Sequence, residues 1–78
     1  MGKPSLMVES EKLAKRIAYE LVANYPGEQI SKTEIRRHYN IAWVKGAVTF
    51  AILEDYGFTV LSRAVIVPSV LPEEDLTS

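Results

Sequence analysis

The segment from Ile30 to Gly57 constrains the fold most, because it carries local signals that begin and end two short helices. Ser31 stands where an N-cap residue would, and Glu34 follows three residues later, which is the pattern of a capping box. Ile30 before the cap and Ile35 after it can close over the helix start as a hydrophobic staple. We therefore predict that a helix begins directly after Ser31.

The end of this helix and the course of the next are also predicted from local signals. Residues 39–41 interrupt the helical pattern, and Asn40 can adopt the left-handed conformation that ends a helix. A second helix is expected from about Ala42 to Tyr56, and Gly57 is its natural stop. The segment thus predicts two helices joined by a three-residue turn.

The first part of the chain predicts one more helix. Leu13, Ile17 and Leu21 recur every four residues and form an apolar stripe, so we expect a helix over residues 10–25. Residues 1–9 carry no periodic pattern and are expected to form a flexible lead-in.

The run FTVLSRAVIVP, residues 58–68, predicts β-structure because it is rich in Val, Ile, Phe and Thr. Two short strands with a tight turn near Ser62 and Arg63 are favoured, although one longer strand also fits. Residues 69–78 hold three acidic side chains and no basic one, and they are expected to form a flexible tail. The folded domain is therefore predicted to span residues 10–68.

Composition limits the class of protein. The chain has 78 residues, enough for one small domain, and chains of this size often gain stability by pairing, so we expect a homodimer. The absence of cysteine excludes disulfides and zinc–thiolate sites and fits a reducing compartment. No segment has the length of a membrane span or the pattern of a signal peptide, so we expect a cytoplasmic protein without membrane contact.

Catalysis, cofactors and metal ions are not expected. His38 is the only histidine, and no carboxylates lie at ligand spacing from it. Glu54 and Asp55 are adjacent and therefore point to different sides of a helix. The sequence also lacks a glycine-rich phosphate loop and any nucleophile with a partner base, so it predicts a protein that is not an enzyme.

The order of elements, namely helix, short extended segment, helix, helix and hairpin, resembles that of a winged helix-turn-helix domain. The run IAWVKGAVTFAILEDYGFTV looks like the recognition helix and wing of such domains, and its spacing is similar to that of the gamma domain of FtsK-type DNA translocases and of MarR-like regulators. The matching positions are Ile41 in the turn, Gly46, Phe50, Leu53 and Gly57. Over roughly residues 10–68, the resemblance implies an α+β fold of three helices with a short C-terminal β-hairpin wing.

The resemblance further implies that the protein binds double-stranded DNA as a small transcriptional or DNA-organising regulator. In such domains the second helix of the motif enters the major groove, and the helix before it crosses the phosphate backbone. The implied DNA-binding residues are Trp43, Val44, Lys45, Val48 and Thr49 at the groove, Lys32, Arg36 and Arg37 on the supporting helix, and Arg63 at the tip of the wing. A cation near a helix start, such as Lys45, opposes the helix dipole, and bound DNA would relieve that conflict.

Charge supports this hypothesis locally and opposes it globally. The whole chain has a formal net charge of -1, whereas residues 30–53 carry four basic side chains and one acidic one. This is a weak footprint for a nucleic-acid-binding protein, and a dimer would double it. A further hypothesis is that the acidic tail of residues 69–78 covers the basic face and regulates it.

A second interpretation arises because the last predicted helix is apolar nearly all round, with Val44, Val48 and Ile52 on the face that should meet DNA. Such a helix is normally buried on both sides. The alternative function is therefore a protein-interaction module in which this stripe contacts a partner or a second copy of the chain. Trp43 has two interpretations as well, because it could contact DNA or pack against Tyr39 or the first helix.

Overall fold

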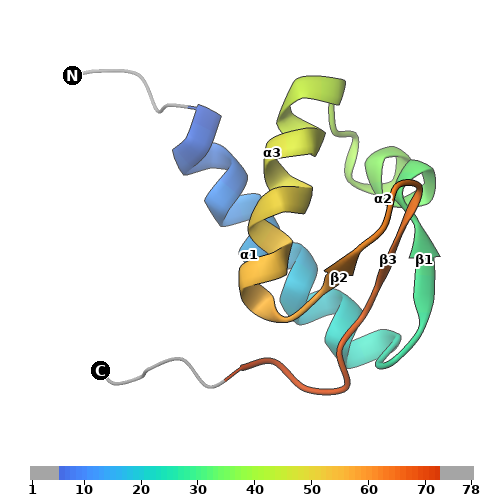
Figure 1. Cartoon of the computed structure of the whole chain (residues 1–78). Coiled ribbons are helices and arrows are strands. Elements are labelled where there is room, and N and C mark those ends of the chain that lie inside the picture. The colour runs from blue at the N-terminus through green and yellow to red at the C-terminus, as the bar shows by residue number, and fades with distance from the viewer. Residues whose placement is uncertain (1–5, 73–78) are drawn as a thin grey trace, which may run out of the picture.

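The computed structural model describes residues 6–72, which form three α-helices and a small three-stranded antiparallel sheet (Figure 1). In chain order the elements are α1 (Leu6–Asn24), β1 (Gln29–Ser31), α2 (Lys32–Tyr39), α3 (Trp43–Leu53), the short 3-10 helix η1 (Glu54–Tyr56), β2 (Thr59–Val60) and β3 (Ala64–Ile66). The α+β class predicted from the sequence is therefore confirmed.

Helix α1 is longer than predicted. It begins at Leu6 rather than Ser10, so residues 6–9, which we expected in a flexible lead-in, belong to the helix. Leu6, Met7 and Glu9 are of types that favour helical backbone, which accounts for the longer helix. Residues 1–5 of the predicted lead-in lie outside the described part. The apolar stripe of α1 is buried against the rest of the domain, with most of its contacts to α3.

The boundaries of α2 follow the local signals closely. Ser31 Oγ accepts hydrogen bonds from the backbone N–H groups of Thr33, at 3.1 Å, and Glu34, at 3.4 Å. The reciprocal bond, in which the Ser31 N–H would donate to the Glu34 carboxylate, is not formed among the described residues, so only half of the capping box is present. At the other end, Asn40 has φ 55° and ψ 55°, in the left-handed conformation predicted for it.

The C-terminal end of α2 and the C-terminal end of α3 with η1 are closed by the same pattern of backbone hydrogen bonds. The N–H of Ile41 donates to the Arg36 carbonyl at 2.8 Å, and the N–H of Phe58 donates to the Leu53 carbonyl at 3.2 Å. These six-to-one bonds around a left-handed residue are typical of a Schellman motif. Gly57, with φ 91°, supplies that residue after η1, so the helix predicted to end at Tyr56 finishes as a 3-10 turn.

Residues 58–68 form two short strands, as favoured from the sequence, rather than one longer strand. β3 lies in the middle, paired antiparallel with β2 on one side and with β1 on the other. The N–H of Leu61 donates to the Ala64 carbonyl at 2.8 Å, which closes the turn at Ser62 and Arg63. This turn lies beside the start of α2 (Figure 1), where the N–H of Lys32 donates to the Arg63 carbonyl at 2.9 Å.

A single apolar core joins the helices to the sheet. Its buried members are Ala14, Ile17, Ala18, Leu21, Ile35, Ile41, Phe50, Leu53, Phe58, Val65 and Val67. The partly buried Ile30 packs against this core too, so both residues of the predicted staple contribute to it. Leu71 also packs there, although we expected it in the flexible tail. Residues 73–78, which hold the three acidic side chains of that tail, lie outside the described part.

Candidate nucleic-acid interface

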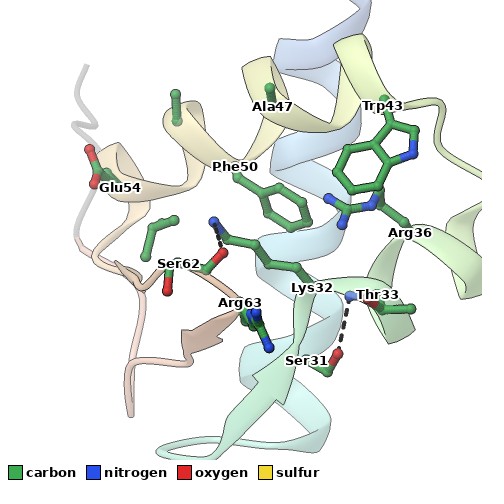
Figure 2. A pocket seen from close by; sticks show the side chains of 12 residues that line it. Ser31, Lys32, Thr33, Arg36, Trp43, Ala47, Phe50, Glu54, Ser62 and Arg63 are labelled. Carbon is green, nitrogen blue, oxygen red and sulfur yellow. Dashed lines mark hydrogen bonds between the residues drawn. The ribbon is translucent and has the colours of Figure 1, made fainter.

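A groove opens between α2, α3 and the β2–β3 turn (Figure 2). Its walls carry Lys32 and Arg36 from α2 and Arg63 from the turn, and α3 contributes Trp43 and Phe50. Glu54 lies at the far end and is the one carboxylate among the lining residues. Three positive side chains thus line one concave surface beside the N-terminal end of α3.

Arg36 is held between two aromatic rings in this groove. Its guanidinium carbon, Cζ, lies 3.9 Å from the centre of the Trp43 ring and 5.6 Å from the centre of the Phe50 ring. Guanidinium groups at such distances are attracted to aromatic faces, and their planar shape suits stacking. Phe50 is buried, with 3% of its surface exposed, so the core anchors one end of this stack.

Gly46 explains how α2 and α3 come close enough to form the stack. A Cβ atom at this position would lie 3.2 Å from Arg36 Cδ and 3.6 Å from Ile41 Cγ2. Both distances concern side chains of α2 and of the turn that follows it. The small residue noted in the sequence therefore leaves room for the aliphatic part of Arg36 between the two helices.

Lys32 fixes the hairpin turn as well as contributing charge. Its Nζ donates to the Ser62 carbonyl at 3.3 Å and lies 5.3 Å from the centre of the Phe50 ring. Within residues 6–72, neither Lys32 nor Arg36 nor Arg63 forms an ion pair. The two ion pairs of that part of the chain involve Arg16 with Glu20 and Lys45 with Glu9. Glu54, the one carboxylate of the groove, therefore pairs with none of its three cations.

Three residues expected at the DNA-facing surface lie elsewhere. Lys45 Nζ pairs with Glu9 Oε1 of α1 at 3.4 Å, so its conflict with the helix dipole is relieved within the chain. Thr49 is fully buried, and its hydroxyl donates to the Lys45 carbonyl at 2.7 Å. Val48 is half-buried. These residues are therefore not part of the groove, and Thr49 cannot contact DNA in this conformation.

The exposed face of α3 also differs from the stripe predicted from the sequence. Ile52 packs against the core and Val48 is half-buried, so Val44, Val48 and Ile52 do not form one exposed surface. The exposed residues of the helix are Trp43, Val44, Ala47 and Ala51, and they continue into Glu54 and Asp55 of η1. Trp43 and Val44 have 74% and 69% of their surfaces exposed. This face is apolar and carries no positive charge.

The predicted pair of arginines is divided between two surfaces. Arg36 is half-buried in the groove, whereas Arg37 is exposed and lines a separate hollow beside α1 and β1 together with His38. Adjacent helical residues point in different directions, which accounts for the separation. The structure thus brings together four of the predicted site residues, Lys32, Arg36, Trp43 and Arg63, and adds Phe50, which the sequence indicated only as a core residue.

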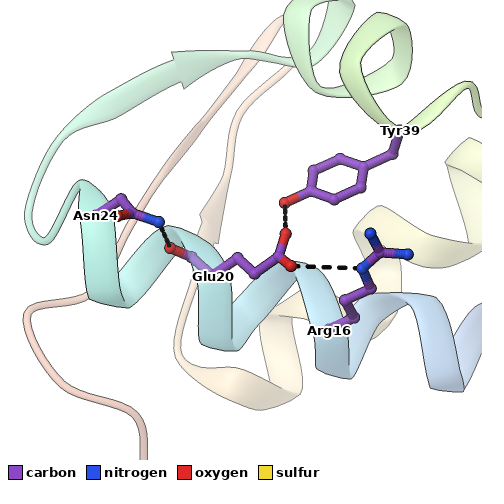
Figure 3. Close-up of polar contacts among 4 residues, drawn as sticks. All are labelled: Arg16, Glu20, Asn24 and Tyr39. Atoms are coloured by element: carbon purple, nitrogen blue, oxygen red, sulfur yellow. Dashed lines mark hydrogen bonds and ion pairs between the residues drawn. The ribbon is translucent and has the colours of Figure 1, made fainter.

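A polar cluster outside the groove fixes the C-terminal end of α2 against α1 (Figure 3). The Tyr39 hydroxyl donates to Glu20 Oε1 at 2.5 Å, and Arg16 Nε donates to Glu20 Oε2 at 3.4 Å. The hydrogen bond from Tyr39 lowers the pKa of Glu20, while burial and the neighbouring Glu20 carboxylate raise the pKa of Tyr39. Tyr39 therefore contacts α1 itself, and Trp43 instead packs on Arg36.

No protein-family model, curated protein or solved structure matches the chain. Within residues 6–72, no helix combines the length and apolar character needed to cross a membrane. The same part of the chain gathers no group of three or more side chains of the kinds that hold a metal ion. The groove and the exposed face of α3 are therefore the features of the described chain that bear on its function.

Proposed function

We propose that this protein is a small winged helix-turn-helix protein that binds double-stranded DNA through the phosphate backbone and acts as a transcriptional or DNA-organising regulator. The observation that carries the proposal is the groove in which Lys32, Arg36 and Arg63 gather without ion-pair partners in the described chain. Basic side chains on a supporting helix and on an adjoining hairpin are suited to neighbouring phosphates. The order of the helices and strands, with a short turn between α2 and α3, is consistent with this fold family.

The chemistry of α3 favours weak sequence discrimination. Base edges in the major groove are distinguished mainly by hydrogen-bonding side chains, and the exposed face of α3 offers only the indole N–H of Trp43 before Glu54. Val44 and Ala47 could contact thymine methyl groups, which supply limited specificity. Glu54 and Asp55 repel phosphate at the other end of the helix. We therefore propose that DNA approaches the N-terminal end of α3 and is held by its backbone.

Replacing Arg63 by Ala tests this proposal, with Lys15 to Ala as a control that removes one positive charge from the exposed side of α1. Binding of mixed-sequence duplex DNA is measured by fluorescence anisotropy at several salt concentrations. If Arg63 contacts a phosphate, its loss weakens binding to all sequences and makes the slope of log K against log salt shallower by roughly 0.9. The control should leave that slope unchanged. Absence of duplex binding at low salt would refute the proposal.

The second candidate function is a protein-interaction module, and the exposed apolar face of α3 favours it. Trp43 and Val44 are the two most exposed large apolar residues of the helix. A second copy of the chain would cover this face and form the homodimer that the small size of the domain suggests. Replacing Val44 by Asp should then lower the sedimentation coefficient from the dimer value to the monomer value. A wild-type protein that sediments as a monomer would contradict this candidate.

A further inference from the structure

We infer that the outer face of Trp43 is a stacking surface for an unpaired nucleobase, and that the cations of the groove hold the phosphates next to that base. The inference rests on the proposed DNA binding and adds a preference for single-stranded nucleotides, alone or at the end of a duplex. It concerns a residue that the DNA-backbone interface does not require.

The geometry of the stack carries the inference. Phe50 is buried, Arg36 lies over it, and Trp43 lies over Arg36 with its ring centre 3.9 Å from the guanidinium carbon (Figure 2). One face of the indole is therefore occupied by a flat cation. Yet 74% of Trp43 remains exposed, so the ring presents its other face to solvent. A fourth planar group would continue the same series.

An unpaired base is the planar group that fits this position best. Inside a duplex, both faces of each base are covered by neighbouring base pairs, and only the edges are accessible in the grooves. Trp43 has one hydrogen-bond donor for an edge, the indole N–H, but a complete aromatic face for stacking. Aromatic rings that receive bases in this way, next to a positively charged groove, are the usual means of binding single strands.

The charges beside the stack determine which kind of planar ligand is favoured. Lys32 and Arg63 line the same groove as Trp43, and neither has an ion-pair partner in residues 6–72. A neutral aromatic ligand would use the stack but not these cations. A nucleotide uses both, because its base and its phosphates are joined by a short flexible sugar. Glu54, at the other end of the groove from Trp43, disfavours phosphate there (Figure 2).

The test compares two DNA probes with the full chain, a blunt duplex and the same duplex with a short single-stranded overhang, by anisotropy of a dye on the blunt end. We expect the overhang to bind roughly 5- to 150-fold more tightly than the blunt duplex, the range that stacking of one base on an aromatic ring provides. In Trp43→Ala this ratio should fall to about one, whereas Trp43→Phe, which keeps an aromatic face, should retain most of it.

Two control variants separate stacking from charge. Arg63→Ala should weaken binding of the overhang probe at least as much as that of the blunt duplex, with a shallower salt slope for both probes, whereas Lys15→Ala on the exposed side of α1 should change neither. Circular dichroism verifies that each variant is folded. Equal binding of both probes by the wild-type protein, or an unchanged ratio in Trp43→Ala, would refute the stacking surface and leave DNA binding intact. Failure of both probes to bind at low salt would refute the proposed function as well.

Discussion

Replacing Ser10 by Ala should stabilise the protein, although it removes a polar group from the buried side of α1. Ser10 is fully buried in α1, and its hydroxyl has no hydrogen-bond partner among the described residues. A buried hydroxyl without a partner destabilises the native state by about 1–3 kcal/mol. Ala also favours helical backbone over Ser, by about 0.5 kcal/mol. Loss of the small packing contribution of Oγ offsets part of this gain.

We therefore expect Ser10→Ala to raise the free energy of unfolding by about 1–2 kcal/mol, measured by urea denaturation followed by far-ultraviolet circular dichroism. In a domain of this size, each 1 kcal/mol should raise Tm by about 4–8 °C. Thr49→Val is the matched control, because Thr49 is equally buried but its hydroxyl donates to the Lys45 carbonyl at 2.7 Å. Removing this satisfied hydroxyl should lower stability by about 0.5–1.5 kcal/mol.

The two substitutions should thus have opposite signs although both delete one buried hydroxyl. If Ser10→Ala lowered stability as much as Thr49→Val does, the Ser10 hydroxyl would be satisfied in solution and the reasoning would be refuted. The control has a second use. Because Thr49 is buried, Thr49→Val should leave DNA affinity unchanged at temperatures where the variant is folded, contrary to the role that the sequence implied for this residue.

Three further outcomes follow from other parts of the structure. Tyr39→Phe should lower Tm at neutral pH, because it removes the hydrogen bond that lowers the pKa of Glu20. This bond stabilises the protein only while the Glu20 carboxylate is ionised, so the difference in Tm from the wild type should shrink as pH falls below 4.5. A difference in Tm that does not depend on pH would contradict this. Gly57→Ala should cost about 1–2 kcal/mol in urea denaturation, since a residue with φ 91° is strained when it carries a Cβ atom. Deleting residues 73–78 should tighten DNA binding if the acidic tail covers the groove, and an unchanged affinity would dispose of that hypothesis.

The parts of the fold that could be predicted from the sequence are those fixed by neighbouring residues. Ser31 accepts hydrogen bonds from N–H groups two and three residues along, and Asn40 ends α2 through its own backbone conformation. Gly57 acts in the same way after η1. Such signals depend on side-chain type over a few positions, so a single sequence contains them completely. The two strands after Gly57 were also favoured, by β-branched composition and a polar turn.

Features that depend on distant residues could not be predicted in this way. The ion pair between Lys45 and Glu9 joins positions that are 36 residues apart, so the sequence presented Lys45 as a cation available to DNA. The central place of β3 in the sheet depends equally on the path of the whole chain. The start of α1 at Leu6 was missed because the apolar periodicity that predicted this helix begins only at Leu13. In each case tertiary contacts, or weak local preferences, decide the outcome.

Helix α3 shows most clearly why the candidate site was harder to predict than the fold. Its residues are apolar on nearly every side, so periodicity alone does not distinguish the face that meets α1 from the face that meets solvent. Only the packing of α1 and the hairpin shows that Trp43 and Val44 remain exposed while Thr49 is covered. Both proposed functions use this exposed apolar face, which the sequence alone did not identify.

Both candidate functions use the exposed face of α3, so a measurement of whether they compete can distinguish them. A second copy that covers Trp43 and Val44 would also block the Trp43 end of the groove, where nucleic acid is proposed to approach. Self-association through α3 and DNA binding should then compete, so raising the protein concentration should weaken the apparent affinity of each groove for DNA. A dimer that forms through another surface, such as the exposed side of α1, would instead leave both grooves open and strengthen binding to duplexes long enough to reach both. The concentration dependence of DNA binding therefore reports which surface of the domain pairs, provided that the protein pairs at all.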